Sequence, residues 1–403
     1  MGSSVTGEAA PPGASPADPS GVPPRGPTTP DDAMAAAFRA RSAVLAWGSP
    51  PRARRQQWAA RFVHLARRDA SALARLAIQT GGLCRRDVVA DQRAAFRPYR
   101  TGWRRTPQVR SDKPPAARVV SSLNDDAAPL THVFRGVLPA LLNGDCVITA
   151  VQPHAVPMVA YLRELALEAG LPGDVWQQLE GQDRRLSWVL TEHTDASVTA
   201  CCTPRSAPGS ITRPGLFVVR KDAPLRPAVR DAVQTAFRTA GRHCTTTPVI
   251  AVHAHHYDRF LDLFAAEARE LEERARRSPE TVLSRLISDH QMDAVEAYVR
   301  RAVEENARVV VSGDALAFGR HAHGPVVLRQ RHLDLIDAAH VPPGPVAVVA
   351  PFTAWSEVLW AARGTGRHVI VHTTSPLRQL APQFAALRVD DLRLVRPTFT
   401  LRR

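Results

Sequence analysis

Short apolar runs of strand length alternate with amphipathic segments of helix length through most of the chain after about residue 118. The predicted strands are residues 118–121, 145–149, 186–191, 197–201, 215–219, 248–253, 308–312, 346–351 and 368–372. Apolar residues recur at helical spacing between these runs, for example in residues 226–240 and 257–277. Strands that alternate with helices form parallel sheets covered on both faces, so the pattern predicts a doubly wound α/β fold.

The segments before the first strand differ in character. Residues 1–32 are rich in Pro, Gly, Ala and Ser, and we expect a disordered leader there because such a segment buries little apolar surface. Helical spacing of apolar residues over 35–81, interrupted at residues 49–51, predicts an antiparallel helical pair, with another helix at 88–96. A chain of 403 residues with 44% hydrophobic composition is expected to form two packed domains.

Composition argues against several classes of partner. The formal charge is +14, but nearly all of it is Arg dispersed among Asp and Glu, so we expect no nucleic-acid groove. No apolar run reaches the roughly 18 residues that a membrane span needs, and the N-terminus does not resemble a signal peptide. The five cysteines form no CxxC pair and no metal-ligand spacing, which is typical of a reduced compartment. We therefore expect a cytoplasmic protein without a membrane anchor or a metal.

Several phrases of the chain, in order, resemble the aldehyde dehydrogenase family from about residue 35 to residue 397. They include "PLTHVFRGVLPALLNGDCVITA", "APLRPAVRDAVQTAFRTAGRHCTTTPVIAVHAHHYDRFLDLF" and "GPVAVVAPFTAWSEVLWAARGTGRHVIVHTTS". The resemblance implies two Rossmann-like domains, a nucleotide-binding type at 33–213 and a catalytic type at 214–397, with residues 398–403 as a tail. It does not extend over the family's first strands or its Gly-rich terminal segment, which leaves homo- and hetero-oligomeric assembly open.

Cys244 stands where the family keeps its nucleophile, on a predicted tight connection after a helix that Gly241 would cap. A cysteine thiolate can attack a carbonyl carbon and carry the acyl group as a thioester. Arg242 and His243 would lower the thiol pKa if they point toward it. The alternative reading is a buried free cysteine inherited with the fold.

The residues that assist this cysteine in the family are altered. No carboxylate occurs between Asp195 and Asp222, where the family has its general base, so water attack on a thioester should be slow. The family's oxyanion-binding Asn falls at Ala127, and Asn124 lies three residues earlier. Asn124 is either a substitute oxyanion donor or an ordinary turn residue.

The cofactor positions are altered as well. The family's ribose-binding Lys falls at Ala150, next to Thr149, and its Gly-Ser turn falls at Cys202 and Thr203. We assign NAD or NADP binding to these four residues by resemblance, since no GxGxxG motif indicates a different dinucleotide site. Three histidines (His253, His255, His256) have the composition of a metal cluster, but their place at a strand end and helix start favours cap or surface roles.

Two functions follow from these observations. The first is a divergent oxidoreductase in which Cys244 acts on a small-molecule aldehyde or acyl thioester with NAD or NADP. The alternative is a catalytically inactive relative that serves as a binding or scaffold subunit, because the base, the oxyanion donor and the cofactor anchors are altered together. The substrate and the choice between NAD and NADP are not encoded in any motif.

Overall fold

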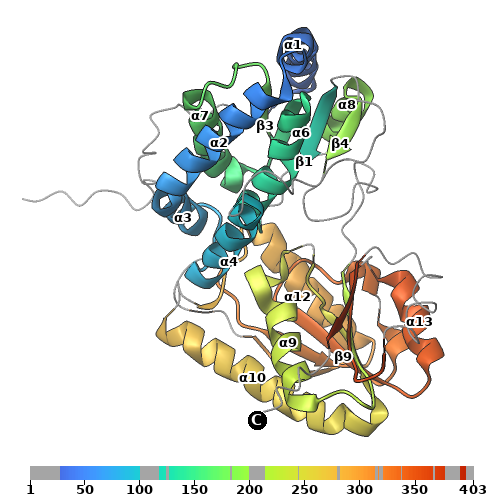
Figure 1. Cartoon of the computed structure of the whole chain (residues 1–403). Coiled ribbons are helices and arrows are strands. Elements are labelled where there is room, and N and C mark those ends of the chain that lie inside the picture. The colour runs from blue at the N-terminus through green and yellow to red at the C-terminus, as the bar shows by residue number, and fades with distance from the viewer. Residues whose placement is uncertain are drawn as a thin grey trace, which may run out of the picture.

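The computed structural model describes residues 28–99, 118–123, 127–181, 184–198, 214–243, 245–278, 282–313, 316, 321–336, 338–365, 368–376 and 391–395. These residues form two domains, the first drawn in blue to green and the second in yellow to red (Figure 1). Each domain contains its own sheet, covered by helices.

The described chain begins with the helices α1 (Pro30–Gly48), α2 (Arg52–Arg68), α3 (Ala70–Gln79) and α4 (Arg85–Phe96). Thr29 and Asp32 form a capping box at the start of α1, in which each side chain accepts the other residue's backbone N–H. Residues 30–32, which the prediction had placed at the end of the leader, therefore belong to α1. The predicted helical pair consists of three helices, because the backbone at Asp69 leaves the helical region and separates α2 from α3.

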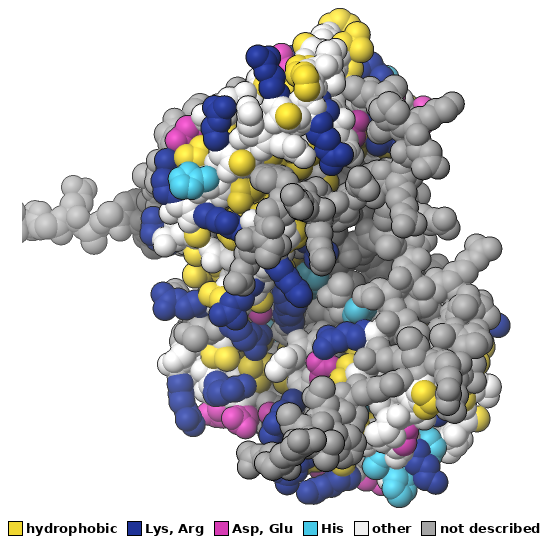
Figure 2. All heavy atoms as spheres, viewed as in Figure 1, with side chains coloured by type: hydrophobic (Ala, Val, Ile, Leu, Met, Phe, Trp, Pro, Cys, Tyr) yellow, Lys and Arg dark blue, Asp and Glu magenta, His cyan; other side chains and the backbone are white. Residues whose placement is uncertain are grey.

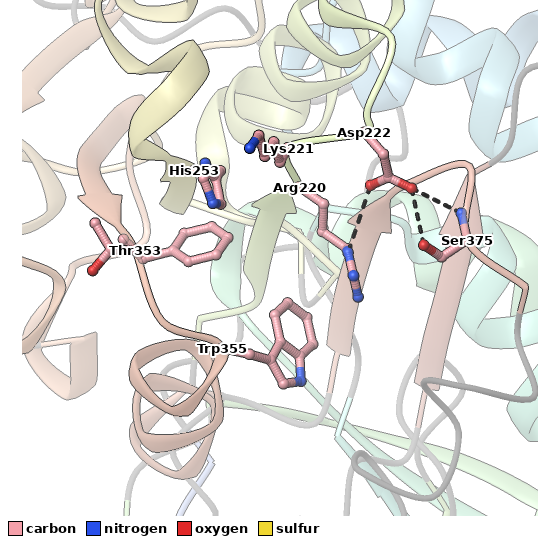
Figure 3. Close-up of a pocket in the computed structure, with 8 residues that line it drawn as sticks. Arg220, Lys221, Asp222, His253, Thr353, Trp355 and Ser375 are labelled. Atoms are coloured by element: carbon pink, nitrogen blue, oxygen red, sulfur yellow. Dashed lines mark hydrogen bonds and ion pairs between the residues drawn. The ribbon is translucent and has the colours of Figure 1, made fainter.

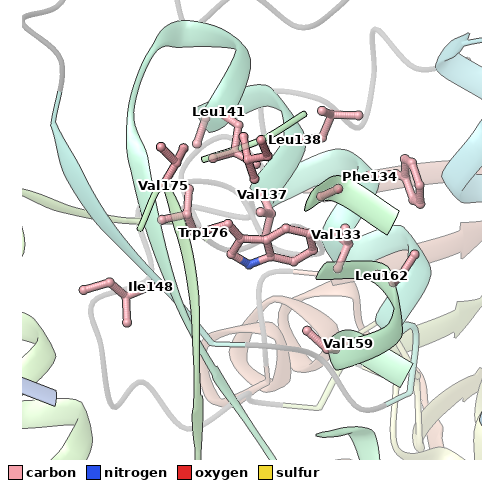
Figure 4. Packing of buried hydrophobic residues seen from close by; sticks show 14 of the residues in the cluster. Val133, Phe134, Val137, Leu138, Leu141, Ile148, Val159, Leu162, Val175 and Trp176 are labelled. Carbon is pink, nitrogen blue, oxygen red and sulfur yellow. The ribbon is translucent and has the colours of Figure 1, made fainter. Parts of the chain in front are cut away.

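The first sheet contains four strands among the described residues, all parallel, in the order β3-β2-β1-β4. They are β1 (Val119–Leu123), β2 (Cys146–Val151), β3 (Trp176–Glu180) and β4 (Ala196–Val198). The connecting helices are α5 (Pro129–His132), α6 (Leu138–Asn143), α7 (Val156–Glu168) and α8 (Arg184–His193), with a π-helical turn, η3 (Val133–Val137), between α5 and α6. Trp176 is fully buried in the core of this domain and belongs to one apolar cluster with Phe134, Ile148 and Leu162 (Figure 4).

One predicted strand of this domain was wrong. Residues 186–191 belong to α8, where Leu186, Val189 and Leu190 are buried while Trp188 is 65% exposed. That spacing is helical, and the apolar composition of the short run had suggested a strand instead. The sheet instead contains β3, in a segment where no strand had been predicted.

The second sheet contains seven strands among the described residues, in the order β11-β10-β5-β6-β9-β8-β7. They are β5 (Leu216–Val219), β6 (Val249–His253), β7 (Arg308–Val311), β8 (Val326–Arg329), β9 (Val346–Phe352), β10 (His368–His372) and β11 (Asp391–Val395). All neighbouring pairs are parallel except β7 and β8. The main helices are α9 (Leu225–Phe237), α10 (Tyr257–Arg277), α12 (Asp289–Glu304) and α13 (Trp355–Gly364).

Both faces of the second sheet are covered. Along β5, Leu216 and Val218 join an apolar cluster that includes residues of α12 and α13. Phe217 and Val219 join a second cluster that includes residues of α9 and α10. Because successive strand residues point to opposite faces, this alternation places helices on both sides of the sheet. The predicted doubly wound α/β fold is confirmed.

Asp222 joins two loops at the carboxyl ends of neighbouring strands, β5 and β10. Its carboxylate accepts hydrogen bonds from the hydroxyl of Thr373, from the backbone and hydroxyl of Thr374 at 2.9 and 2.7 Å, and from the backbone and hydroxyl of Ser375 at 2.9 and 3.0 Å. Partial burial alone would raise the pKa of Asp222, but these hydrogen bonds outweigh it and lower the pKa to about 2.

This pKa predicts a pH-dependent contribution to stability. The unfolded pKa of an Asp is about 3.9, so the ionised Asp222 stabilises the fold above that value, and the contribution is lost as the pH falls through the folded pKa of about 2. We expect the difference in unfolding free energy between wild type and Asp222→Asn, measured by urea denaturation, to be largest above about pH 5 and to vanish toward about pH 2. The exposed Asp293 provides the matched control as Asp293→Asn. A difference independent of pH would contradict the assignment.

The surface agrees with a dispersed distribution of charge. On the face shown in Figure 2, Lys and Arg side chains are scattered over both domains and Asp and Glu lie among them. The same view shows a hollow between the two domains. None of the helices in the described part of the chain combines the length and the apolar character needed to cross a membrane.

Candidate functional site

The loop that leads to Cys244 has an unusual backbone. Helix α9 ends at Phe237, earlier than the predicted cap at Gly241, and a short turn, η5 (Arg238–Gly241), follows it. Thr239, Ala240 and Gly241 have φ values of 51°, 53° and 70°, in the left-handed region that residues other than glycine rarely adopt. A Cβ atom at Gly241 would lie 1.7 Å from the carbonyl oxygen of Gly344, so only glycine fits there. Cys244 itself lies outside the described residues.

A buried carboxylate of the first domain holds this loop. Asp87, on α4 and only 2% exposed, accepts a hydrogen bond from the backbone N–H of Thr239 at 2.9 Å. The same carboxylate accepts from the Ser284 hydroxyl at 2.7 Å and from the Cys84 thiol at 3.3 Å. The guanidinium of Arg86 lies 3.3 Å from its other oxygen. Left-handed backbone persists only where its surroundings fix it, and Asp87 provides that fixation from the other domain.

The residues on either side of Cys244 are also anchored. Arg242 is buried and donates to the carbonyl of Gly81, in the turn between α3 and α4, at 2.9 Å. His243 accepts the backbone N–H of Thr245 through Nδ1 at 3.1 Å, and its carbonyl accepts the Thr246 hydroxyl at 2.8 Å. The loop is therefore tied both to the first domain and to the chain that enters β6.

The helix that carries Asp87 also holds a second segment of the first domain, one turn further along. Asp91, four residues after Asp87 and also buried, accepts the backbone N–H groups of Leu130 and Thr131 at 3.0 and 2.9 Å. These are the first free N–H groups of α5, which follows β1, and Asp91 takes the place of a cap because Ala128 offers no side-chain oxygen. Residues four apart on a helix lie about 6 Å apart along its axis. In Figure 1, α4 lies where the two domains meet.

One helix therefore brings the carboxyl end of β1 close to the loop before β6. The three residues between β1 and Ala127, Asn124 among them, lie outside the described residues. Sequence reasoning missed Asp87 and Asp91, although their spacing puts both carboxylates on the face of α4 that also carries the buried Val88 and Ala95. Charged residues at the buried positions of a helix were therefore the signal in the sequence that could have identified these two carboxylates.

A buried polar pair lies beside this junction. The Nε2 atom of His132, on α5, is 2.6 Å from the hydroxyl oxygen of Ser122, on β1, and both residues are almost completely buried. Nothing in the sequence pattern had singled out this pair, because the two residues belong to separate elements that meet only in the folded domain.

The first sheet also has the topology of a nucleotide site. The chain runs from β1 to β2 on one side and then crosses from β3 to β4 on the other side of β1, so β1 and β4 flank the point where the connections change direction. Ligands of open α/β sheets bind at the carboxyl ends of such strands. Asn124 follows β1 directly in the sequence, and Cys202 and Thr203 follow β4 by a few residues, but all three lie outside the described residues.

The remaining predicted cofactor residues, Thr149 and Ala150, lie within β2. Both are completely buried, and the hydroxyl oxygen of Thr149 accepts a hydrogen bond from Trp176 Nε1 at 2.9 Å. Thr149 therefore uses its side chain inside the core, and Ala150 has no polar side-chain atom. The structure does not bring these two side chains to an open site.

The two described cysteines are poor nucleophiles. Burial, and next the charge of Asp87, raises the pKa of Cys84 to about 11. Burial, with smaller contributions from Asp145 and Asp174, raises the pKa of Cys146 to about 12. Neither thiol ionises appreciably near neutral pH, and the thiolate is the reactive form.

Comparisons with known proteins identify the family of this chain. The sequence profile of the aldehyde dehydrogenase family matches residues 24–201 and 215–376. A 3,6-anhydro-alpha-L-galactose dehydrogenase of Vibrio sp. (strain EJY3) is 24% identical over 365 residues, covering 82% of this chain and 75% of that protein. A 3-sulfolactaldehyde dehydrogenase of Pseudomonas putida is 28% identical over 255 residues, covering 59% of this chain and 52% of that protein. The chain thus spans about half the length of several curated relatives that it matches.

Solved structures show the same fold. An aldehyde dehydrogenase from Bacillus cereus in complex with NAD+ has a TM-score of 0.73 and 19% identity, with 91% of this chain and 81% of that chain covered. A glyceraldehyde-3-phosphate dehydrogenase, GapN, from Methanocaldococcus jannaschii in complex with NADP has a TM-score of 0.71 and 16% identity, with 91% of this chain and 86% of that chain covered.

Proposed function

The chain belongs to the aldehyde dehydrogenase family, and from this premise we propose that it is an oxidoreductase that acts on an aldehyde or an acyl thioester with NAD or NADP. We assign the nucleophile to Cys244. The observation that carries this proposal is the left-handed loop immediately before Cys244, held across the domain junction by the buried carboxylate of Asp87. Such a backbone is costly to maintain and is typical of functional sites.

In the proposed reaction, the thiolate of Cys244 forms a bond to the carbonyl carbon of the substrate, and the carbonyl electron pair moves onto oxygen. Asn124, which follows β1 in the sequence, is the proposed hydrogen-bond donor to that oxygen. An acyl thioester would react in the reverse direction, and reduced NAD or NADP would then supply the hydride. For an aldehyde, the electron pair returns from oxygen to the carbon and the hydride leaves, and oxidised NAD or NADP would supply the acceptor for it. The acyl group held on Cys244 as a thioester is then released to a second nucleophile. The lack of a carboxylate between Asp195 and Asp222 favours a thiol over water in that role.

The strand order of the first sheet suits a dinucleotide site, but the described side chains there offer few polar groups to bind one. The change of direction between β1 and β4 provides the usual crevice, and the residues after these strands would contact the cofactor. Because Ala150 and the engaged hydroxyl of Thr149 offer no free polar group, backbone groups together with Cys202 and Thr203 would have to hold it. We therefore expect weaker binding than a lysine at position 150 would give.

A second candidate is a binding or scaffold subunit that has lost catalysis. The observation in its favour is that the stretch where the family has its base contains no carboxylate and that Ala150 stands at the expected ribose anchor. In this reading the junction formed by Asp87 and Asp91 serves only to hold the two domains together.

Calorimetric titration with NAD and NADP, followed by a turnover screen with aldehydes and acyl thioesters, separates the two candidates. We expect binding of at least one dinucleotide with a dissociation constant of about a millimolar or tighter, and turnover of at least one substrate. Binding without turnover across the screen would favour the scaffold, and no binding of either dinucleotide would overturn the oxidoreductase.

A further inference from the structure

The second sheet has a pocket of its own at its carboxyl edge. A cavity of about 510 Å³ is lined by Arg220, Lys221, Asp222, His253, Phe352, Thr353, Trp355 and Ser375. These residues come from the ends of four strands, β5, β6, β9 and β10, and Figure 3 shows them converging on one space. The loop before Cys244 enters β6 at its other end, so this pocket lies on the opposite edge of the sheet from the proposed nucleophile.

The strand order of the second sheet also indicates a ligand site at the carboxyl ends of β5 and β10. From β5 the chain passes through α9 to β6 on one side, whereas from β9 it crosses through α13 to β10 on the other side of β5 and continues to β11. The loops after β5 and β10 therefore leave in opposite directions. In open α/β sheets, the crevice between two such loops is the usual binding site. A cavity of this size is also in the range that holds a small organic molecule, about 300 to 1,000 Å³.

The charges of the pocket favour an anion. Arg220 and Lys221 bring two positive charges, and the one carboxylate among the lining residues, Asp222, already accepts hydrogen bonds from the loop after β10. Arg220 forms an ion pair with Asp222, in which Nε lies 3.6 Å from Oδ1, a distance too long for a hydrogen bond (Figure 3). Within the described part of the chain, the terminal N–H groups of this guanidinium have no hydrogen-bond acceptor. Guanidinium N–H groups pair well with carboxylates and phosphates.

His253 adds a further donor. Its Nδ1 accepts the backbone N–H of His255 at 3.2 Å, so the neutral ring carries its proton on Nε2. Burial, and then the positive charges of Lys221, His255, His256 and Arg220, lowers the pKa of His253. Burial by itself disfavours a charge of either sign, so only the part of this shift that comes from the neighbouring positive charges indicates surroundings that favour a bound negative charge.

The other side of the pocket is apolar. The ring of Phe352 lies edge-on to His253, with 5.4 Å between ring centroids, and the guanidinium of Arg220 lies 5.0 Å from the centre of the Trp355 ring (Figure 3). One negative charge near the rim, the carboxylate of Glu357, would repel an anion. This carboxylate caps α13 and accepts hydrogen bonds from the hydroxyl of Thr353 and from the backbone N–H groups of Thr353 and Ala354. The carboxylate of Glu357 is thus already engaged by three donors.

We propose that this pocket binds a small organic anion, with its carboxylate or phosphate held by Arg220, Lys221 and His253 and its apolar part against Phe352 and Trp355. The site is independent of Cys244 and of the dinucleotide crevice, since it lies at the far edge of the second sheet. Carboxylate and phosphate share the recognition chemistry, so the test distinguishes them.

Phenyl phosphate, benzoate, benzyl alcohol and inorganic phosphate are suitable probes for calorimetry on the full chain. We expect phenyl phosphate or benzoate to bind more tightly than both benzyl alcohol, which lacks the charge, and inorganic phosphate, which lacks the apolar part. A preference between the two anions identifies the head group. Saturating NAD or NADP should leave probe binding unchanged, so failure of the oxidoreductase proposal would not affect this result.

Variants locate the site. Arg220→Gln should weaken binding of the better anion about tenfold or more, because it removes a charge-assisted hydrogen-bond donor. Lys221→Gln, at an exposed position that should not disturb folding, should weaken it severalfold. Arg259→Gln, an exposed arginine of α10, is the matched control and should leave it unchanged. Equal binding by wild type, Arg220→Gln and Lys221→Gln, displacement of the probe by NAD, or tighter binding of benzyl alcohol than of either anion would overturn the proposal.

Discussion

Replacement of Cys244 by alanine should reduce turnover of the best aldehyde or acyl thioester by about a thousandfold or more, while binding of NAD or NADP is retained. The thiolate is the group that forms the covalent intermediate in the proposed reaction, and loss of a nucleophile typically removes most of the rate enhancement. The measurements are nicotinamide absorbance for turnover and calorimetry for dinucleotide binding. Retained binding shows that the loss is chemical and is not a failure to fold.

Iodoacetamide labelling with peptide mapping provides the companion measurement. In wild type, Cys244 should react faster than Cys84 and Cys146, whose pKa values are raised by burial. Cys146→Ala is the matched control, and it should retain turnover and the labelling of Cys244. Full activity in Cys244→Ala would exclude this cysteine as the nucleophile. A slow, unselective reaction at Cys244 in a protein without turnover would support the scaffold reading.

Replacement of Asp87 by asparagine should lower the free energy of unfolding by about 2 to 4 kcal/mol. The charged carboxylate accepts hydrogen bonds from Thr239 and Ser284 in a buried setting, and hydrogen bonds to a charged group contribute about 1.5 to 3 kcal/mol each. The neutral amide can replace only part of them. Urea denaturation measures the change, and the exposed Asp293→Asn should differ from wild type by less than about 0.5 kcal/mol.

The same variant also tests whether the junction positions the cysteine loop. Because Asp87 fixes the left-handed backbone at Thr239, folded Asp87→Asn should label more slowly or less selectively at Cys244 and should lose kcat more than it changes KM. Destabilisation with unchanged labelling and kcat would assign Asp87 a purely structural role. No destabilisation would contradict the hydrogen-bond network itself.

Sequence patterns determined the parts of this protein that depend on local spacing. The apolar runs at β2, β5, β6, β9 and β10 are fully or mostly buried, and such runs identify strands of a parallel sheet without any knowledge of the strand order. Gly241 also predicted a tight connection before β6, although α9 already ends at Phe237 and Gly241 does not cap it. Gly241 has a left-handed backbone, and only glycine fits there. The family resemblance rested on these same phrases.

Tertiary structure decided what depends on residues distant in sequence. Residues 186–191 were predicted as a strand from their apolar composition, and the burial of Leu186, Val189 and Leu190 within the first domain shows that they belong to the helix α8. Asp87 and Thr239 are 152 positions apart, and the pocket at Arg220 draws on the ends of four strands. Strand order determines which of these groups meet, and strand order results from packing the whole sheet, so no local pattern encodes it.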